Sequence, residues 1–302
     1  MSAHAELNLS SPDLFGDLPL SSRVRVEFGA QSCAGKDHPI NGDHHLIVRL
    51  GRSQDTLITS LPDDIIGDRF DEYGYAMIVA DGLGNPIESE AAGRVALSTL
   101  LQLVIHFAKW NLRVDCNEIE HEIRMRADRF FHHVDLALTR QSATGPIGNL
   151  QTSLTTTFGA GRDLFYAHVG HSRAYLFRDR MLLRLTHDHT ISARREPAPR
   201  TVRLVDVKVM TRDFEHILEQ TLGMSGPAGP RVHIGNFTLQ DRDQILVCTN
   251  GITDVVDDVA IADLFDSNRP VEECCATLVD LAVKAGGEDD ATAMVARYHV
   301  PA

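Results

Sequence analysis

The chain has little positive charge. Its 29 lysine and arginine residues stand against 42 aspartate and glutamate residues, which gives a formal net charge of -13. This balance argues against nucleic acid as a partner, because binding a phosphate backbone needs clustered basic side chains. It suits a protein that gathers carboxylates around metal ions. Long uncharged apolar runs are also lacking, so we expect no segment that spans a membrane.

Cysteine is scarce and has no pattern. The five cysteines are odd in number, and their spacing matches neither a zinc finger nor a disulfide framework. The amino terminus lacks the basic and then apolar pattern of a secretory signal. Together these absences predict a cytoplasmic protein.

The order of the predicted elements indicates the fold class. Residues 1–22 are rich in Ser, Pro, Asp and Leu without a period and are predicted to be a flexible leader, and residues 23–302 are predicted to form a single domain. Helical patterns cover 88–110, 117–139 and 271–285, with strand-like runs before, between and after them. Because strands and helices do not alternate strictly, this order favours an α+β fold with antiparallel sheets.

Three connecting segments are predicted from their local composition. The segment from Gly51 to Gly74 is polar and contains turn-forming Pro, Asp and Gly residues, and it is interpreted as an insertion loop between two strands. Thr190 to Thr211 is irregular and is interpreted as a mobile flap. Phe214 to Leu222 is predicted to be a short helix that stops at Gly223.

The stretch from Tyr75 to Glu90 is the centre of the functional argument. A short apolar run of strand length breaks at Asp81-Gly82, and a long helical pattern follows. The strand therefore delivers a carboxylate to a tight turn, where the Asp81 side chain and the Gly82 carbonyl can both hold a hard divalent cation. An isolated Asp-Gly pair is more often only a turn.

Further polar turns at strand ends strengthen the metal interpretation. They are Asn41-Gly42-Asp43, Asn250-Gly251 with Asp254, and Glu288-Asp289-Asp290. Oxygen ligands without a pair of Cys or His favour Mg²⁺ or Mn²⁺ over zinc. Two such ions about 4 Å apart bind a phosphate and acidify a bridging water. Each turn alone is more often structural, but together they predict a metal site.

Five stretches occur in the order of a known set of motifs. They are Val79–Gly84, Ala167–Leu176, Leu185–His189, Cys248–Asp254 and Gly286–Thr292. In residue types and in order they resemble the motifs of the PPM, or type 2C, metal-dependent serine/threonine phosphatases, and in particular those of the bacterial members. The resemblance runs from about Asn41 to the end of the chain. It implies a four-layer α-β-β-α sandwich with two antiparallel sheets, and two Mn²⁺ or Mg²⁺ ions in the cleft between the sheets.

The same resemblance implies a role for individual residues. Asp81 would bridge the two ions, with the Gly82 carbonyl as a further ligand. Asp289 and Asn250 would hold the first ion, Asp43 would serve the second, and Asp254 would lie near a third, weaker site. The reaction implied is attack of a metal-activated water on phosphoserine or phosphothreonine, without a covalent enzyme intermediate. The implied partner is a protein phosphorylated by a serine/threonine kinase.

Departures from the family pattern leave two functions open. The family has Asp where this chain has Asn250 and His171, and its phosphate-anchoring Arg is replaced by His38, with Lys36 as a nearby substitute. Lys36 and His38 therefore join Asp43 and Asp81 as catalytic candidates, although plain loop residues are the alternative for the first two. One function is an active phosphatase. The other is a degenerate relative that binds a phosphoprotein or another partner and catalyses little.

Overall fold

The computed structural model describes residues 23–60, 69–107, 116–190, 201–202, 218–224, 226 and 228–301. The predicted leader at 1–22 and most of the predicted flap at 190–211 lie outside these ranges.

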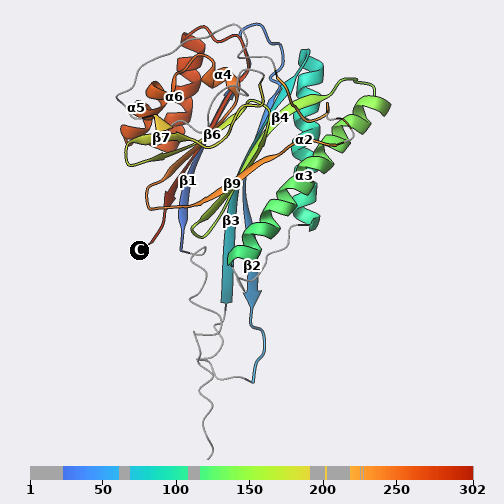
Figure 1. The fold of residues 1–302 in the computed structure, drawn as a ribbon. Helices are drawn as coiled ribbons and strands as arrows, with labels where there is room; N and C mark the ends of the chain where they lie inside the picture. Colours follow the sequence, from blue (N-terminus) through green and yellow to red (C-terminus); the bar gives the residue numbers. More distant parts are fainter. Residues whose placement is uncertain are drawn as a thin grey trace, which may run out of the picture.

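Two antiparallel sheets form the centre of the molecule (Figure 1). The first has the strand order β1 (Arg25–Cys33), β11 (Ala291–His299), β10 (Gln244–Cys248), β6 (Arg173–Arg178), β7 (Met181–Arg184) and β8 (Thr201–Val202). The second has the order β2 (Asp43–Asp55), β3 (Arg69–Leu83), β4 (Gln151–Ala160), β5 (Asp163–Val169) and β9 (His233–Thr238). Every pairing between neighbouring strands is antiparallel, as predicted.

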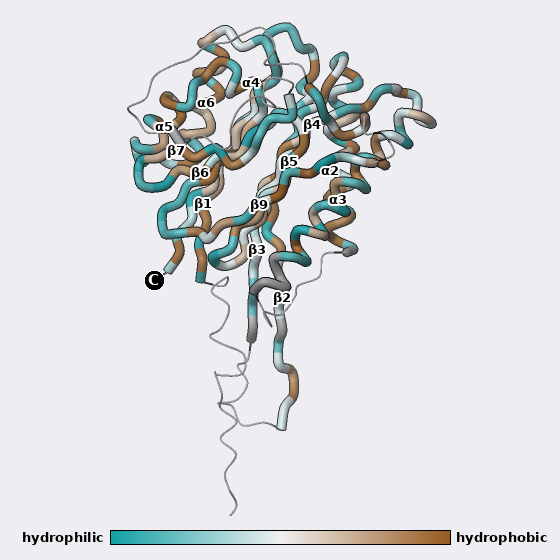
Figure 2. Tube along the Cα trace, in the orientation of Figure 1, coloured by the Kyte–Doolittle hydropathy of each residue, from teal (hydrophilic) through white to brown (hydrophobic). Residues whose placement is uncertain are grey.

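An apolar layer between the sheets holds them face to face. Met77 and Val79 of β3 pack in one buried cluster with Val247 of β10 and Met294 of β11. Successive side chains of a strand point to opposite faces, so Ile78, between Met77 and Val79, belongs to a different cluster on the outer side of its sheet. Figure 2 shows the resulting changes of hydropathy along the chain. A continuous apolar run thus gives the same strand two buried faces.

Helices cover the outer face of each sheet. On the second sheet lie α2 (Pro86–Phe107) and α3 (Cys116–Thr144), and on the first lie α4 (Asn250–Thr253), α5 (Asp258–Asp266) and α6 (Val271–Lys284). The start of α2 is fixed by Asn85, whose side-chain oxygen accepts hydrogen bonds from the backbone of Ile87 and Glu88, both at 3.1 Å. The four-layer α-β-β-α sandwich is therefore confirmed. None of the helices in the described ranges combines the length and the apolar character needed to cross a bilayer.

The predicted insertion loop from Gly51 to Gly74 is wrong at both of its ends, while residues 61–68 lie outside the described ranges. Strands β2 and β3 continue through much of it, with Gly51 opposite Tyr73 and Asp55 opposite Arg69. Because β4 pairs only with Gly74–Leu83 of β3, the far ends of β2 and β3 form a two-stranded arm that reaches beyond the other strands (Figure 1). An arm that packs against no third layer needs no apolar alternation, so its sequence looks like a loop.

The predicted short helix at 214–222 is also wrong where the structure describes it. Leu222 is bonded to Thr152 of β4 through both backbone groups, at 3.0 and 3.1 Å, and its side chain is fully buried. Leu218 forms a second bridge with Thr190. The backbone groups that a helix would need are thus already paired with other segments. Residues 214–217 lie outside the described ranges.

Candidate metal centre

The β2–β3 pair brings the first two carboxylates together. Asp43 and Asp81 stand opposite each other in the register and are only 7% and 5% exposed. Both are flanked by a glycine that allows close approach to α2. A Cβ on Gly42 would lie 1.6 Å from Ser89 Oγ, and one on Gly82 would lie 2.0 Å from the Ser89 carbonyl oxygen. The two glycines therefore let both strand ends pass against the first turn of the helix.

The ends of the first sheet supply the opposite side of the cluster. Thr249, which follows β10, and Thr292 of β11 both donate hydroxyl hydrogen bonds to Asp43 Oδ2, at 2.8 and 2.7 Å. Asn250 Nδ2 donates to Asp289 Oδ2 at 3.2 Å and to Asp254 Oδ2 at 3.0 Å. The predicted ligands thus converge, although they come from four separate parts of the chain.

The pKa values of the two strand carboxyls reflect this crowding. Burial raises the pKa of Asp81 well above its usual range, and the charges of Asp43, Asp289, Asp254 and Asp290 raise it further. Burial also raises the pKa of Asp43 well above its usual range, although the two threonine hydrogen bonds oppose the shift. A carboxyl must be deprotonated to bind a cation, so the raised pKa values couple metal binding at this cluster to proton release.

Two buried oxygens in the cluster fit a hard divalent cation. Asp81 Oδ2 and Asn250 Oδ1 are buried and accept no hydrogen bond from the residues that the structure describes. A buried acceptor without a partner is costly, so such atoms need an explanation. His171 Nδ1 lies 3.3 Å from Asp81 Oδ2, but its hydrogen-bond partner is Ser153 Oγ at 2.9 Å. A cation would supply the missing partner for both oxygens, and the oxygen-rich donor set suits Mg²⁺ or Mn²⁺.

Asp290 is a residue of the carboxylate cluster to which the sequence analysis assigned no role. Its Oδ1 accepts a hydrogen bond from the Gly35 backbone at 2.7 Å and lies 2.9 Å from His38 Nδ1. Its Oδ2 accepts from the Gly42 backbone at 2.6 Å. Asp290 therefore anchors the whole loop from Gly35 to Gly42 against the start of β11. One signal in the sequence could have identified Asp290. The family motif has Asn at the position of Asp290 and Asp at the position of Asn250, so the two residue types are exchanged in this chain.

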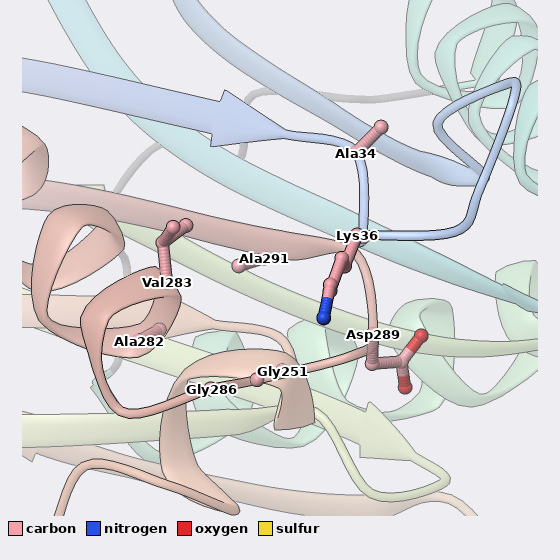
Figure 3. A pocket seen from close by; sticks show the side chains of 10 residues that line it. Ala34, Lys36, Gly251, Ala282, Val283, Gly286, Asp289 and Ala291 are labelled. Carbon is pink, nitrogen blue, oxygen red and sulfur yellow. The ribbon is translucent and has the colours of Figure 1, made fainter.

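The two basic candidates lie in different surroundings. His38 is 37% exposed on its side chain, and a ligand atom of its ring lies within 4.8 Å of carboxylate oxygens of Asp289 and Asp290. Lys36 lines a separate cavity that adjoins Asp289 (Figure 3). Of the two, His38 stands closer to the hydrogen-bonded network of the carboxylate cluster.

The other histidines near the site have structural partners. His168 is fully buried, with Nδ1 2.7 Å from Thr155 Oγ1 and Nε2 donating to the Gly170 carbonyl at 3.1 Å. Burial lowers the pKa of His189 to about 4, and His189 Nδ1 accepts a hydrogen bond from the Gly170 backbone at 3.2 Å. Both rings therefore support the turn that carries His171.

Comparisons with known proteins find that the chain is similar to bacterial serine/threonine phosphatases, although no protein-family model matches it. It is 26% identical over 221 residues to the serine/threonine phosphatase stp of Listeria welshimeri, covering 72% of this chain and 82% of that protein. It is 28% identical over 225 residues to the serine/threonine protein phosphatase PstP of Mycobacterium tuberculosis, covering 73% of this chain and 40% of that protein. The solved catalytic domain of PstP in complex with two manganese ions shares the fold, with a TM-score of 0.65, 23% identity, and coverage of 91% of this chain and 99% of that chain.

Proposed function

We propose that the chain is a phosphatase of the bacterial PPM, or type 2C, kind and that it hydrolyses phosphoserine and phosphothreonine in phosphorylated proteins by a metal-dependent reaction. Its similarity to bacterial serine/threonine phosphatases, and a fold shared with a solved domain that binds two manganese ions, support this proposal. The observation that carries the proposal is the convergence of Asp43, Asp81, Asn250 and Asp289 at the ends of both sheets, with two buried oxygens that accept no hydrogen bond. Residues 23–302 form the proposed phosphatase domain.

The proposed ligand roles follow the positions of the oxygens. Asp81, with the Gly82 carbonyl, would serve both ions. Asp289 and Asn250 would serve the first ion, and Asp43 would serve the second. When bound, the two divalent ions supply an acidified water and neutralise the charge of the phosphate. The threonine hydroxyls on Asp43 Oδ2 keep that carboxylate in one orientation, so its geometry does not depend on the substrate.

His38 is the proposed contact to the substrate phosphate. It occupies the loop position of the family's anchoring arginine, and Asp290 fixes its ring through Nδ1. This arrangement makes Nδ1 the hydrogen-bond donor to the carboxylate and leaves Nε2 for another partner. The loop that carries His38 is held by two further hydrogen bonds to Asp290, so the ring is positioned before a substrate arrives.

The proposed substrate is a protein phosphorylated by a serine/threonine kinase, and the proposed location is the cytoplasm. The thiols support a reducing compartment, since Cys33, Cys248, Cys274 and Cys275 are free cysteines in the described part of the chain.

One assay tests the proposed function directly. The purified protein is expected to hydrolyse p-nitrophenyl phosphate and a phosphothreonine peptide in millimolar Mn²⁺, more slowly in Mg²⁺, and not at all in excess chelator. Release of p-nitrophenol and of inorganic phosphate measures the two reactions. Activity that survives complete metal removal would contradict a metal-dependent mechanism. Peptide binding without any hydrolysis would favour the degenerate phosphoprotein-binding relative.

A third metal site beside Asp254 is expected to discriminate between metals. His171 stands where relatives have Asp, and burial lowers its pKa, although the charges of Asp254 and other carboxylates partly oppose that shift. A neutral imidazole adds no negative charge and prefers Mn²⁺ to Mg²⁺ as a partner. Crystals soaked in Mn²⁺ should therefore show more density at this site than crystals soaked in Mg²⁺, and His171→Asp should raise Mg²⁺ occupancy. Equal occupancy by both ions in the unmodified protein would argue against this role.

A further inference from the structure

A cavity of about 390 Å³ lies beside the carboxylate cluster and is not explained by the metal ligands. Its lining comes from the loop after β1, the start of α4, the end of α6 and the turn before β11 (Figure 3). The residues are Ala34, Gly35, Lys36, Gly251, Ala282, Val283, Gly286, Gly287, Asp289 and Ala291. The volume lies in the range of small ligand-binding pockets.

The cavity is open because its walls carry almost no side chains. Alanines and glycines form most of the lining, and a Cβ placed on Gly286 would meet nothing within 4 Å. Gly286 itself has a φ of +83°, which favours glycine where the chain turns after α6. At Gly35 and Gly251, by contrast, an added Cβ would lie 2.2 and 2.1 Å from the backbone oxygens of Glu288 and Asp290, so these two glycines allow the close backbone packing of the cavity wall.

The cavity and the metal centre share a wall. Asp289 lines the cavity and accepts a hydrogen bond from Asn250, whose neighbour Gly251 is also part of the lining. Consecutive Cα atoms of a peptide are about 3.8 Å apart, so a residue next to a bound phosphoresidue is within reach of the cavity. A peptide with its phosphate at the metal centre would therefore present a neighbouring side chain here.

Lys36 gives the cavity its chemical character. Its ammonium group points into the hollow in Figure 3, between the Gly286 turn and Asp289. No carboxylate in the described ranges forms an ion pair with it, whereas the Asp289 carboxylate is directed to Asn250 Nδ2. A cation over alanine and glycine walls matches a side chain with an apolar stem and a negative end.

We propose that this cavity is a substrate subsite for an acidic side chain, glutamate or aspartate, one or two residues from the phosphorylated residue. Lys36 pairs with the carboxylate of that side chain, and the alanines contact its methylene groups. The inference rests on the proposed phosphatase function and adds a substrate preference to it.

The test compares phosphothreonine peptides that differ at one position. In each set the residues one and two positions away, on either side, are Glu, Gln or Leu in turn. The unmodified protein with Mn²⁺ is expected to favour the best Glu peptide over its Gln counterpart by about tenfold in kcat/KM, as one charge-assisted contact allows. Lys36→Glu should remove or reverse this ratio. Because the ratio is taken within one variant, a general change in activity cancels.

A matched variant controls for the change in net charge. Lys284 lies in the last turn of α6 and is not part of the cavity lining, so Lys284→Glu should keep the Glu-to-Gln ratio of the unmodified protein. The subsite proposal would be overturned if the Glu and Gln peptides differed by less than twofold in kcat/KM at every position. It would also be overturned if Lys36→Glu left their ratio unchanged. A preference for the Leu peptides would show an apolar subsite instead and would also overturn it.

The outcome separates this inference from the proposed function. Hydrolysis of every peptide at the same rate would support the phosphatase and reject the subsite. If no peptide is hydrolysed, the phosphatase proposal fails. Fluorescence polarisation with the same labelled peptides then decides the subsite, which requires tighter binding of the Glu peptide and loss of that difference in Lys36→Glu.

Discussion

The Asp81→Asn protein is expected to lose all detectable hydrolysis and, in metal-free buffer at pH 7, to unfold at a higher temperature than the unmodified protein. The loss follows from the proposed position of Asp81 between both ions. The gain in stability follows from its surroundings, because Asp81 is buried beside several other carboxylates that raise its pKa. An amide of the same shape removes that repulsion. Asp81→Ala should likewise abolish hydrolysis.

The pH dependence gives this prediction a sign. A carboxyl whose pKa is raised by folding binds its proton more tightly in the folded chain. Its contribution to stability is therefore fully present below the pKa of the unfolded chain, about 4. That contribution is lost as the pH rises through the pKa of the folded chain. The metal-free protein should therefore become less stable as the pH rises above about 4, and Asp81→Asn should reduce that decline. Each kcal/mol recovered corresponds to a rise of about 2–4 °C in Tm for a chain of this size class.

Differential scanning fluorimetry with and without Mn²⁺ measures the effect. Mn²⁺ should raise the Tm of the unmodified protein and have little effect on Asp81→Asn. Asp243→Asn is the matched control, since Asp243 is also buried but binds Arg178 Nε at 2.7 Å. Removing the charge of Asp243 takes away the ionic partner of the partly exposed Arg178 and should lower the Tm, which is the opposite of the change expected for Asp81→Asn. A lower Tm for metal-free Asp81→Asn would contradict the crowding of charge at the metal centre.

Asn250→Asp is expected to lower the Mn²⁺ concentration needed for half-maximal activity by about ten- to hundredfold. In the structure the Asn250 amide donates hydrogen bonds to Asp254 and Asp289, in the place where a cation would balance their charges. A carboxylate there would add a unit of negative charge. At an effective dielectric constant of about 20, a unit charge about 4 Å from a divalent ion amounts to about 8 kcal/mol before desolvation. The cost of desolvating the added carboxylate offsets most of this energy, so the net gain in the free energy of metal binding is about 1–3 kcal/mol.

Asp290 partly offsets the loss of metal affinity that Asn250 causes. It is buried and adds a negative charge beside Asp289, but its oxygens already hold the loop backbone and His38. It therefore attracts a cation from a distance and does not replace the missing ligand at Asn250.

Titration with Mn²⁺, followed by activity and by calorimetry, tests the prediction. Asn236→Asp adds the same charge at an exposed position of β9, where the side chain already accepts a hydrogen bond from Arg124, and should leave the Mn²⁺ requirement unchanged. If the unmodified protein is inactive at millimolar Mn²⁺ and Asn250→Asp does not restore activity, the enzyme proposal fails and the binding function takes its place.

The sequence predicted the layers of the fold from the order of its strand-like and helical runs, because a strand that is buried on both faces is apolar throughout. Met77, Ile78 and Val79 are all apolar, and the structure assigns them to two different buried faces. The β2–β3 arm was missed because the strand signal depends on burial of one face, and polar residues such as Ser53 and Asp71 pair there. The backbone hydrogen bonds that hold the arm together do not depend on side-chain type, so the sequence pattern does not indicate them.

The candidate site could be predicted only in part. Motif positions identified the carboxylates at the strand ends, but the direction of a side chain depends on contacts from distant segments. Asp290 is oriented by the backbone of Gly35 and Gly42, more than 200 positions earlier in the chain, and no local pattern reports such a contact. The different surroundings of Lys36 and His38, only two residues apart, have the same origin.

The pairing of β1 with β11 sets when the metal centre can exist during synthesis. β11 lies between β1 and β10 in its sheet, and the turn that precedes it carries Asp289 and Asp290. A nascent chain that has not yet delivered residues 289–299 from the ribosome lacks both a central strand of that sheet and the anchor of the loop around His38. We therefore expect incomplete chains to lack phosphatase activity, and a chain that stops before Asp289 to be inactive.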